Sequence, residues 1–196
     1  MKDLSPPVKY CVFAALLTLM IATRFRHLGS FLHLSDASMA IFFLGGLYLR
    51  RHALFGVFLL LAVAIDYIGI TSRGLDFFQH YCVTPPYTFL LAAYAVLWYA
   101  GRMYSPRMGA NGRAVAAGLG VALLAACASF LISNAAFYWL GGRYAQPHFA
   151  EYIARIWQWG PMFVRSTMIY VASAFLVHAL IVRFASSGGV ESRARV

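Results

Sequence analysis

The chain has 196 residues, of which 62% are hydrophobic and only 11% are charged. This composition excludes a soluble globular domain. Apolar runs close to the length of about 20 residues that crosses a bilayer recur along the sequence, so we expect an all-α, multi-pass membrane protein. The formal net charge of +10 comes from basic residues spread between these runs. It therefore indicates membrane topology and not nucleic-acid binding.

The apolar runs predict six transmembrane helices in a single domain covering residues 1–196. In chain order the helices are expected at 8–23, 35–49, 52–70, 85–103, 113–140 and 161–184. The first is interpreted as a retained helix and not a signal peptide, because it lacks a small-x-small cleavage site and Arg24 and Arg26 follow it directly. Ser35 is expected to cap the second helix, with Asp36 in its first turn.

Basic residues divide unequally between the two sides of the predicted bundle. Ten of the 16 Lys and Arg residues fall on the side that holds both termini, so the positive-inside rule places the N- and C-termini in the cytoplasm. The long connections, at 24–34, 71–84 and 141–160, lie on the opposite side. They carry most of the side chains able to do chemistry: His27, His33, Asp36, Asp76, His80, Cys82, His148 and Glu151.

Asp66 is the one carboxylate inside a predicted span. An ionisable residue within the membrane is costly and faces the protein interior or a wet cavity, so it marks a functional site by default. The alternative is a structural hydrogen bond to a neighbouring helix. Tyr67 projects about 100° away from Asp66 on a helix, so the two need not serve the same pocket.

Cys82 lies in a predicted outer loop just before a helix start, which Thr84 and the following two prolines indicate. The positive end of the helix dipole favours its thiolate. Cys82 is thus a candidate soft-metal ligand or activated nucleophile, against the alternative of a loop cysteine without function. No Cys-x-x-Cys or His-x-x-x-His spacing supports a zinc or iron–sulfur site. A lone thiolate suits one axial position on a metal that a macrocycle already holds.

Three other outer residues are weaker candidates. His27 and His33 flank the first two predicted helices and could act as ligands or hydrogen-bond donors, although most histidines in such loops are simply solvated. Arg155 lies beside Trp157 and Trp159 in a segment expected to form an amphipathic helix in the lipid headgroup layer. The alternative for this segment is a lid from which Arg155 contacts phosphate or amide groups of a ligand.

Small residues recur at four-residue spacing in the first predicted helix, at Ala14, Thr18 and Ala22. Such spacing lets helices approach closely, either within the chain or at a docking face for another membrane subunit. The sequence has no phosphate-binding lysine loop, so we expect that this chain does not hydrolyse ATP itself.

Six short helices with both ends cytoplasmic and a polar outer face resemble the substrate-binding S-components of energy-coupling factor (ECF) vitamin transporters. Three segments are similar to the BtuM group of bacterial cobalamin-uptake proteins, which lack a dedicated energising module: residues 23–38, the pair Asp66–Tyr67, and residues 81–87, which include Cys82 and Tyr87. The similarity covers the first four predicted helices and extends to the rest only through topology.

The resemblance implies uptake of vitamin B12 (cobalamin) across the bacterial inner membrane, and a transporter and not an enzyme, although removal of an axial ligand such as cyanide could accompany binding. It implies that Cys82 coordinates the cobalt and that no other metal is needed. It further implies that donors and acceptors around the corrin come from Asp66, Tyr87, His27, Asp36, Arg155, Tyr67 and His33. The partners would be cobalamin and lipid, with or without an ECF energising module docked on the first helix.

Two alternatives stay open. One is an S-component for another vitamin. The other is an intramembrane transpeptidase or protease in which Cys82 acts with His80 or His148 and an arginine, although no residue is evident to orient the base.

Overall fold

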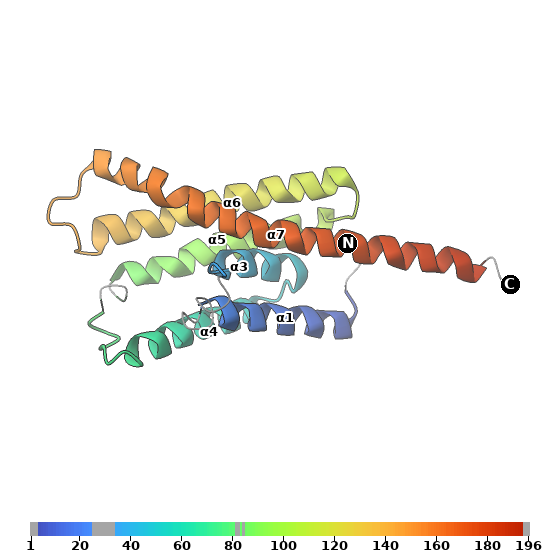
Figure 1. Cartoon of the computed structure of the whole chain (residues 1–196), viewed down its shortest axis with the longest axis horizontal. Coiled ribbons are helices and arrows are strands. Elements are labelled where there is room, and N and C mark those ends of the chain that lie inside the picture. Colours follow the sequence, from blue (N-terminus) through green and yellow to red (C-terminus); the bar gives the residue numbers. More distant parts are fainter. Residues whose placement is uncertain (1–3, 25–33, 81–82, 84, 194–196) are drawn as a thin grey trace.

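The computed structural model describes residues 4–24, 34–80, 83 and 85–193, with side chains described up to residue 184. In these ranges the secondary structure is helical, without strands (Figure 1). The α-helices are α1 (Pro6–Arg24), α3 (Ser38–Tyr48), α4 (His52–Thr71), α5 (Phe89–Tyr104), α6 (Gly112–Leu140) and α7 (Phe149–Arg193). Two 3-10 helices, η1 (Pro85–Thr88) and η2 (Ser105–Arg107), flank α5.

Helix α3 is the centre of the bundle, and its residues from Ala40 to Tyr48 are all buried. It packs most extensively against α5. Gly46 and Gly101 permit this contact, because a Cβ on Gly46 would lie 1.9 Å from the carbonyl oxygen of Trp98, and one on Gly101 would lie 2.1 Å from that of Phe43. Small residues at a helix interface let two backbones touch in this way.

Four helical segments are long and apolar enough to cross a membrane: α1, α4, α6 and residues Phe149–Phe184 of α7. Only 17–33% of their most apolar stretches is buried inside the protein. The remaining apolar surface suits contact with lipid, as expected of an α-helical membrane protein. Helices α3 and α5, with 11 and 16 residues, are shorter than the about 20 residues of a full span. That the chain crosses the membrane six times stays a prediction.

One predicted helix start is wrong, and another is confirmed in position but not in helix type. The helix predicted from 35 begins at Ser38, and its N-cap residue is Ala37, so Ser35 is not the cap. Asp36 precedes the first turn and accepts a hydrogen bond from the backbone N–H of Ser38 (2.9 Å). The helix predicted from 85 begins as the 3-10 turn η1 and becomes α-helical only at Phe89. Thr84, the expected cap, lies outside the described residues.

Helix α7 corrects the prediction for the C-terminal third. The span expected from 161 is one continuous helix that begins at Phe149 and contains Pro161 in its interior. Membrane helices tolerate such a proline because neighbouring groups satisfy the freed backbone. The segment around Arg155 is therefore not a separate surface helix. It is the first part of α7, and the connection that precedes it is only residues 141–148.

Candidate functional site

The centre of the site is an ion pair between helices α1 and α4. Arg24, the last residue of α1, donates from Nε to Asp66 Oδ1 (2.8 Å) and from Nη2 to Asp66 Oδ2 (2.6 Å). The exposed fractions of the two side chains are 9% and 23%. This two-point geometry is the strongest arrangement for an arginine and a carboxylate. The positive charge of Arg24 lowers the free-energy cost of placing the Asp66 carboxylate in an apolar helix.

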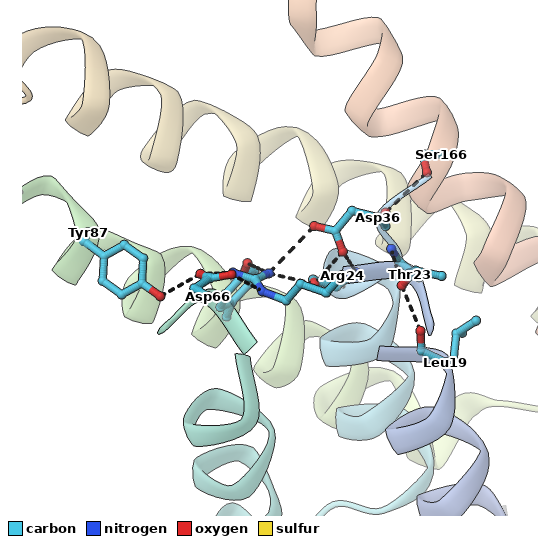
Figure 2. A network of polar contacts seen from close by, with 10 residues as sticks. Leu19, Thr23, Arg24, Asp36, Asp66, Tyr87 and Ser166 are labelled. Carbon is cyan, nitrogen blue, oxygen red and sulfur yellow. Dashed lines mark hydrogen bonds and ion pairs between the residues drawn. The ribbon is translucent and has the colours of Figure 1, made fainter. Parts of the chain in front are cut away.

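Four more side chains complete what we call the ionic network: Tyr87, Ser38, Tyr94 and Asp36 (Figure 2). Tyr87 in η1 donates to Asp66 Oδ2 (2.8 Å). The Nη1 group of Arg24 donates to Ser38 Oγ (2.8 Å) and to the hydroxyl of Tyr94 (3.0 Å). The network thus joins α1, α3, α4, η1 and α5 at one level of the bundle.

Asp36 connects the network to α7. Its Oδ2 lies 3.7 Å from Arg24 Nη1, and its Oδ1 accepts a hydrogen bond from Ser38 Oγ (2.6 Å). The carbonyl oxygen of Asp36 accepts from Ser166 (3.4 Å), and that of Ser35 accepts from Tyr170 (2.8 Å). The two α7 hydroxyls thereby hold the backbone on which the second carboxylate sits.

A cavity of about 360 Å³ opens beside the network. Asp36 and Tyr94 belong to both, so the network forms part of the cavity wall. Ser129, Ser133, Asn134 and Arg155 make the rest of the wall polar, and the apolar part consists of Met39, Leu90, Ala93, Phe130, Phe137, Trp159 and Phe163. This mixture of convergent polar groups and aromatic rings is typical of small-molecule sites.

Arg155 enters this cavity from the first turns of α7. Its guanidinium donates to the hydroxyl of Tyr144 and lies over the rings of Tyr138 and Tyr144, 5.7 and 5.0 Å from their centroids. Both tyrosines come from the end of α6 and the connection that follows. Arg155 is therefore held in place by packing and cation–π contact with side chains of the protein itself.

The structure brings four of the predicted site residues together. Asp66, Tyr87 and Asp36 meet around Arg24, and Arg155 lines the cavity that Asp36 also lines. Tyr67 is separate, as the helical angle predicts: its side chain is 49% exposed and its ring packs on Phe77 at 5.2 Å. Cys82, His27 and His33 lie outside the described residues, so their roles stay predictions. Within the described part, no group of three His, Cys, Asp or Glu residues could hold a metal ion.

Sequence reasoning misses Arg24, Tyr94, Ser38 and Asn134. The sequence indicates Arg24 only as a topology residue, because a basic residue at the end of an apolar run is common. One signal was available: an intramembrane carboxylate near the outer end of its helix needs a cation at the same depth, and Arg24 ends a helix on that side. Asn134 had no comparable signal, since a single amide in an apolar run is unremarkable.

Comparison with the models of known protein families gave no match, and comparison with curated proteins gave none. The function is therefore inferred from the arrangement of the site.

Proposed function

We propose that this chain binds cobalamin at the outer side of the bacterial inner membrane and carries it inward, as an S-component-like protein with six spans and both termini in the cytoplasm. One observation carries the proposal. Asp36, Asp66, Tyr87 and Arg155 are widely separated in sequence, each is implied by the resemblance to the BtuM group, and they converge on one network and its adjoining cavity.

The chemistry of the wall supports a large, amide-rimmed ligand. Polar donors and acceptors line one part of the cavity and aromatic and aliphatic side chains line the other. A corrin needs both, because its edge carries carboxamides and its faces are apolar. Cys82 is five residues before Tyr87 in the sequence, and in this proposal its thiolate takes one axial position of the cobalt.

The exposed face of α1 supports a partner in the membrane. Ala14 and Thr18 are exposed and Ala22 is half-buried, so the small-residue spacing is not used mainly for packing inside this chain. In the proposal this face accepts an energising module, or the chain reorients alone in lipid.

The size of the cavity favours a second candidate. A volume of about 360 Å³ is near the lower limit of the roughly 300–1,000 Å³ of drug-sized sites, and cobalamin exceeds drug size. Cobalamin binding thus requires a cavity wider than this one, whereas a smaller vitamin requires no change. Uptake of a smaller vitamin is therefore the second candidate.

The deciding experiment is isolation of the protein from cells grown with cobalamin, followed by visible absorption spectroscopy. We expect co-purified corrin, and Cys82→Ser should shift its absorption bands or abolish binding. Cys127→Ser, at a half-buried cysteine of α6, is the matched control and should leave the spectrum unchanged.

A growth test completes the design: the wild-type gene should rescue a bacterium deficient in cobalamin uptake, and the Cys82→Ser gene should not. Absence of corrin from a folded wild-type protein, with no rescue, would leave the smaller vitamin as the better proposal. Corrin bound with an unchanged spectrum in Cys82→Ser would remove cobalt ligation alone.

A further inference from the structure

Two arginines stand at one end of helices α4 and α5 without an acid beside them. Arg51 directly precedes α4 and is exposed. Arg102 lies half-buried in the last turn of α5. Its Nη1 donates to the carbonyl oxygen of Arg50 (2.6 Å) and lies 2.6 Å from His52 Nε2, and neither contact brings a negative charge. In the described part of the chain, no carboxylate forms an ion pair with Arg51 or Arg102.

The position of these arginines along the helices matches the lipid headgroup layer. Helix α4 is long and apolar enough to cross a membrane, and Arg51 and His52 lie at its start. Tyr99, 41% exposed, is about one turn deeper on α5, with its hydroxyl 3.0 Å from His52 Nδ1. Tyrosines with a polar tip at this depth are typical of the membrane interface. Basic residues between helices at this level suit the phosphate of an anionic lipid.

An apolar cavity of about 200 Å³ lies between the same two helices, deeper in the bundle. Its aliphatic wall comes from both of them: Leu59, Ala62, Val63, Leu90 and Leu91. Leu91 is 49% exposed, so the cavity borders the outer surface of the bundle. From His52 to Val63 the helix rises about 16 Å, which is close to half the thickness of the ~30 Å hydrocarbon core. An acyl chain that starts at the arginines can therefore reach the cavity.

The polar side chains in the wall of this cavity already make hydrogen bonds within the protein. Arg24 and Tyr87 contact Asp66, and Tyr94 accepts from Arg24. Thr88 donates to the carbonyl oxygen of Pro85 (2.7 Å). The cavity therefore suits an apolar guest better than a polar metabolite. Such a guest would also keep water from this side of the pair of Arg24 and Asp66, and ionic attraction is stronger where water is excluded.

We propose that the surface between α4 and α5 binds one anionic phospholipid. Its phosphate lies at Arg51 and Arg102, and one of its acyl chains occupies the apolar cavity beside the ionic network. The arginines supply the charge that the headgroup needs, and the aliphatic wall supplies contacts for the chain. This binding site is separate from the cavity of the proposed function and does not depend on which molecule is transported.

The test is native mass spectrometry of the purified chain in detergent, titrated with phosphatidylglycerol or with phosphatidylcholine of the same acyl chains. Each arginine at the membrane surface should contribute about fivefold to the affinity for the anionic lipid, so wild type should prefer phosphatidylglycerol about 25-fold. Arg51→Gln and Arg102→Gln should each lower this preference about fivefold. Arg73→Gln is the matched control near the other end of α4. Arg73 is exposed and donates to a carbonyl oxygen of its own helix (2.7 Å), so its loss should leave the preference unchanged.

A second pair of variants tests the acyl chain. Val63→Phe places a ring in the cavity and removes van der Waals contacts with the chain, so both lipids should bind more weakly by about threefold or more, with the preference between them unchanged. Ala64→Phe adds the same ring at an exposed position of α4 outside the cavity wall and should leave both affinities unchanged. Equal effects of the two substitutions would overturn the placement of the chain.

The remaining outcomes decide the headgroup. Equal affinity of wild type for the two lipids, or a preference that survives in both arginine variants, would overturn the proposal. Displacement of phosphatidylglycerol by millimolar inorganic phosphate would overturn it as well, because the site would then serve a small anion alone. Thermal unfolding shows whether each variant is folded. Arg51→Gln keeps the test decisive if Arg102→Gln unfolds, because the side chain of Arg51 is exposed.

Discussion

The ionic network and the opposite end of the bundle use arginine in contrasting ways. In the network, the side chain of Arg24 is only 9% exposed and meets Asp66 and Asp36. The opposite end carries five arginines in the loops and helix ends around residues 49–51 and 102–113, a region without a carboxylate: Arg50, Arg51, Arg102, Arg107 and Arg113. We call this region the basic end.

At the basic end, Arg102 contacts a backbone carbonyl group and a histidine ring. Arg102 donates to the carbonyl oxygen of Arg50 (2.6 Å) and lies 2.6 Å from Nε2 of His52, whose Nδ1 lies 3.0 Å from the hydroxyl of Tyr99. Arg51, Arg107 and Arg113 are exposed. Exposed arginines need no paired acid, because water and anionic lipid headgroups solvate them.

The ionic network and the basic end differ in the free-energy cost of their arginines. A buried ion pair is seldom a net gain over apolar packing, because both ions lose hydration. In the proposed function this cost is accepted for recognition of a ligand. Exposed arginines cost little, because they remain solvated. Variants at the two regions should therefore differ in size and kind of effect.

The largest effect is expected from Arg24→Met. It leaves the partly buried carboxylate of Asp66, 23% exposed, with only Tyr87 as a described partner, so the free energy of unfolding should fall by about 3 kcal/mol, the lower end of the cost of breaking a buried pair. Denaturant unfolding in detergent micelles measures this. The double variant Arg24→Met/Asp66→Leu should regain much of the stability and bind no ligand. Stability equal to wild type in Arg24→Met would show that the pair is not buried as described.

Gly46 lies between the ionic network and the basic end. Its substitution should lower the free energy of unfolding without altering the contacts of either region. Gly46→Ala places a methyl group against the backbone of Trp98, 1.9 Å from its carbonyl oxygen, so α3 and α5 must separate. Overpacking of this kind costs about 1–3 kcal/mol. Gly56→Ala is the matched control, because nothing lies within 4 Å of the place that its methyl group would take. It should be neutral or stabilise α4 by about 0.5–1 kcal/mol.

At the basic end, Arg102→Ala should lower the free energy of unfolding by only about 1 kcal/mol, since a half-exposed hydrogen bond is worth less than a buried charged one. The same unfolding assay measures it, with Arg107→Ala, at an exposed residue, as the control near zero. Ligand affinity should stay unchanged in both variants. A loss as large as that of Arg24→Met would remove the contrast between the two regions.

The residues themselves predicted most of the helices and made Asp66 and Arg155 candidates, and the resemblance added Asp36 and Tyr87. Physical reasons limit the rest. Asp66 was predictable because a carboxylate in an apolar run is too costly to persist without a partner or a wet cavity. The continuity of α7 was not predictable, because Gly160 and Pro161 have the pattern of a helix start. Only packing against α6 shows that the helix passes through these two residues. The cavity was unpredictable because its wall is assembled from side chains of α3, α5, α6 and α7, whose relative rotation no local pattern fixes.

The smallest effect is expected from Arg50→Gly, and its sign is opposite to the others. Arg50 has a φ of 63°, in the left-handed region that costs a residue with a Cβ roughly 1–2 kcal/mol. Glycine adopts this conformation freely but loses more entropy on folding. Its backbone carbonyl remains available to Arg102, so the net change should be a stabilisation of about 0.5 kcal/mol in the same unfolding assay. Arg51→Gly, at the exposed neighbour with an extended backbone, is the matched control and should be neutral or destabilising. Stabilisation by both would point to relief of charge repulsion among the arginines, and stabilisation by Arg50→Gly alone would identify backbone strain as the cost carried by the basic end.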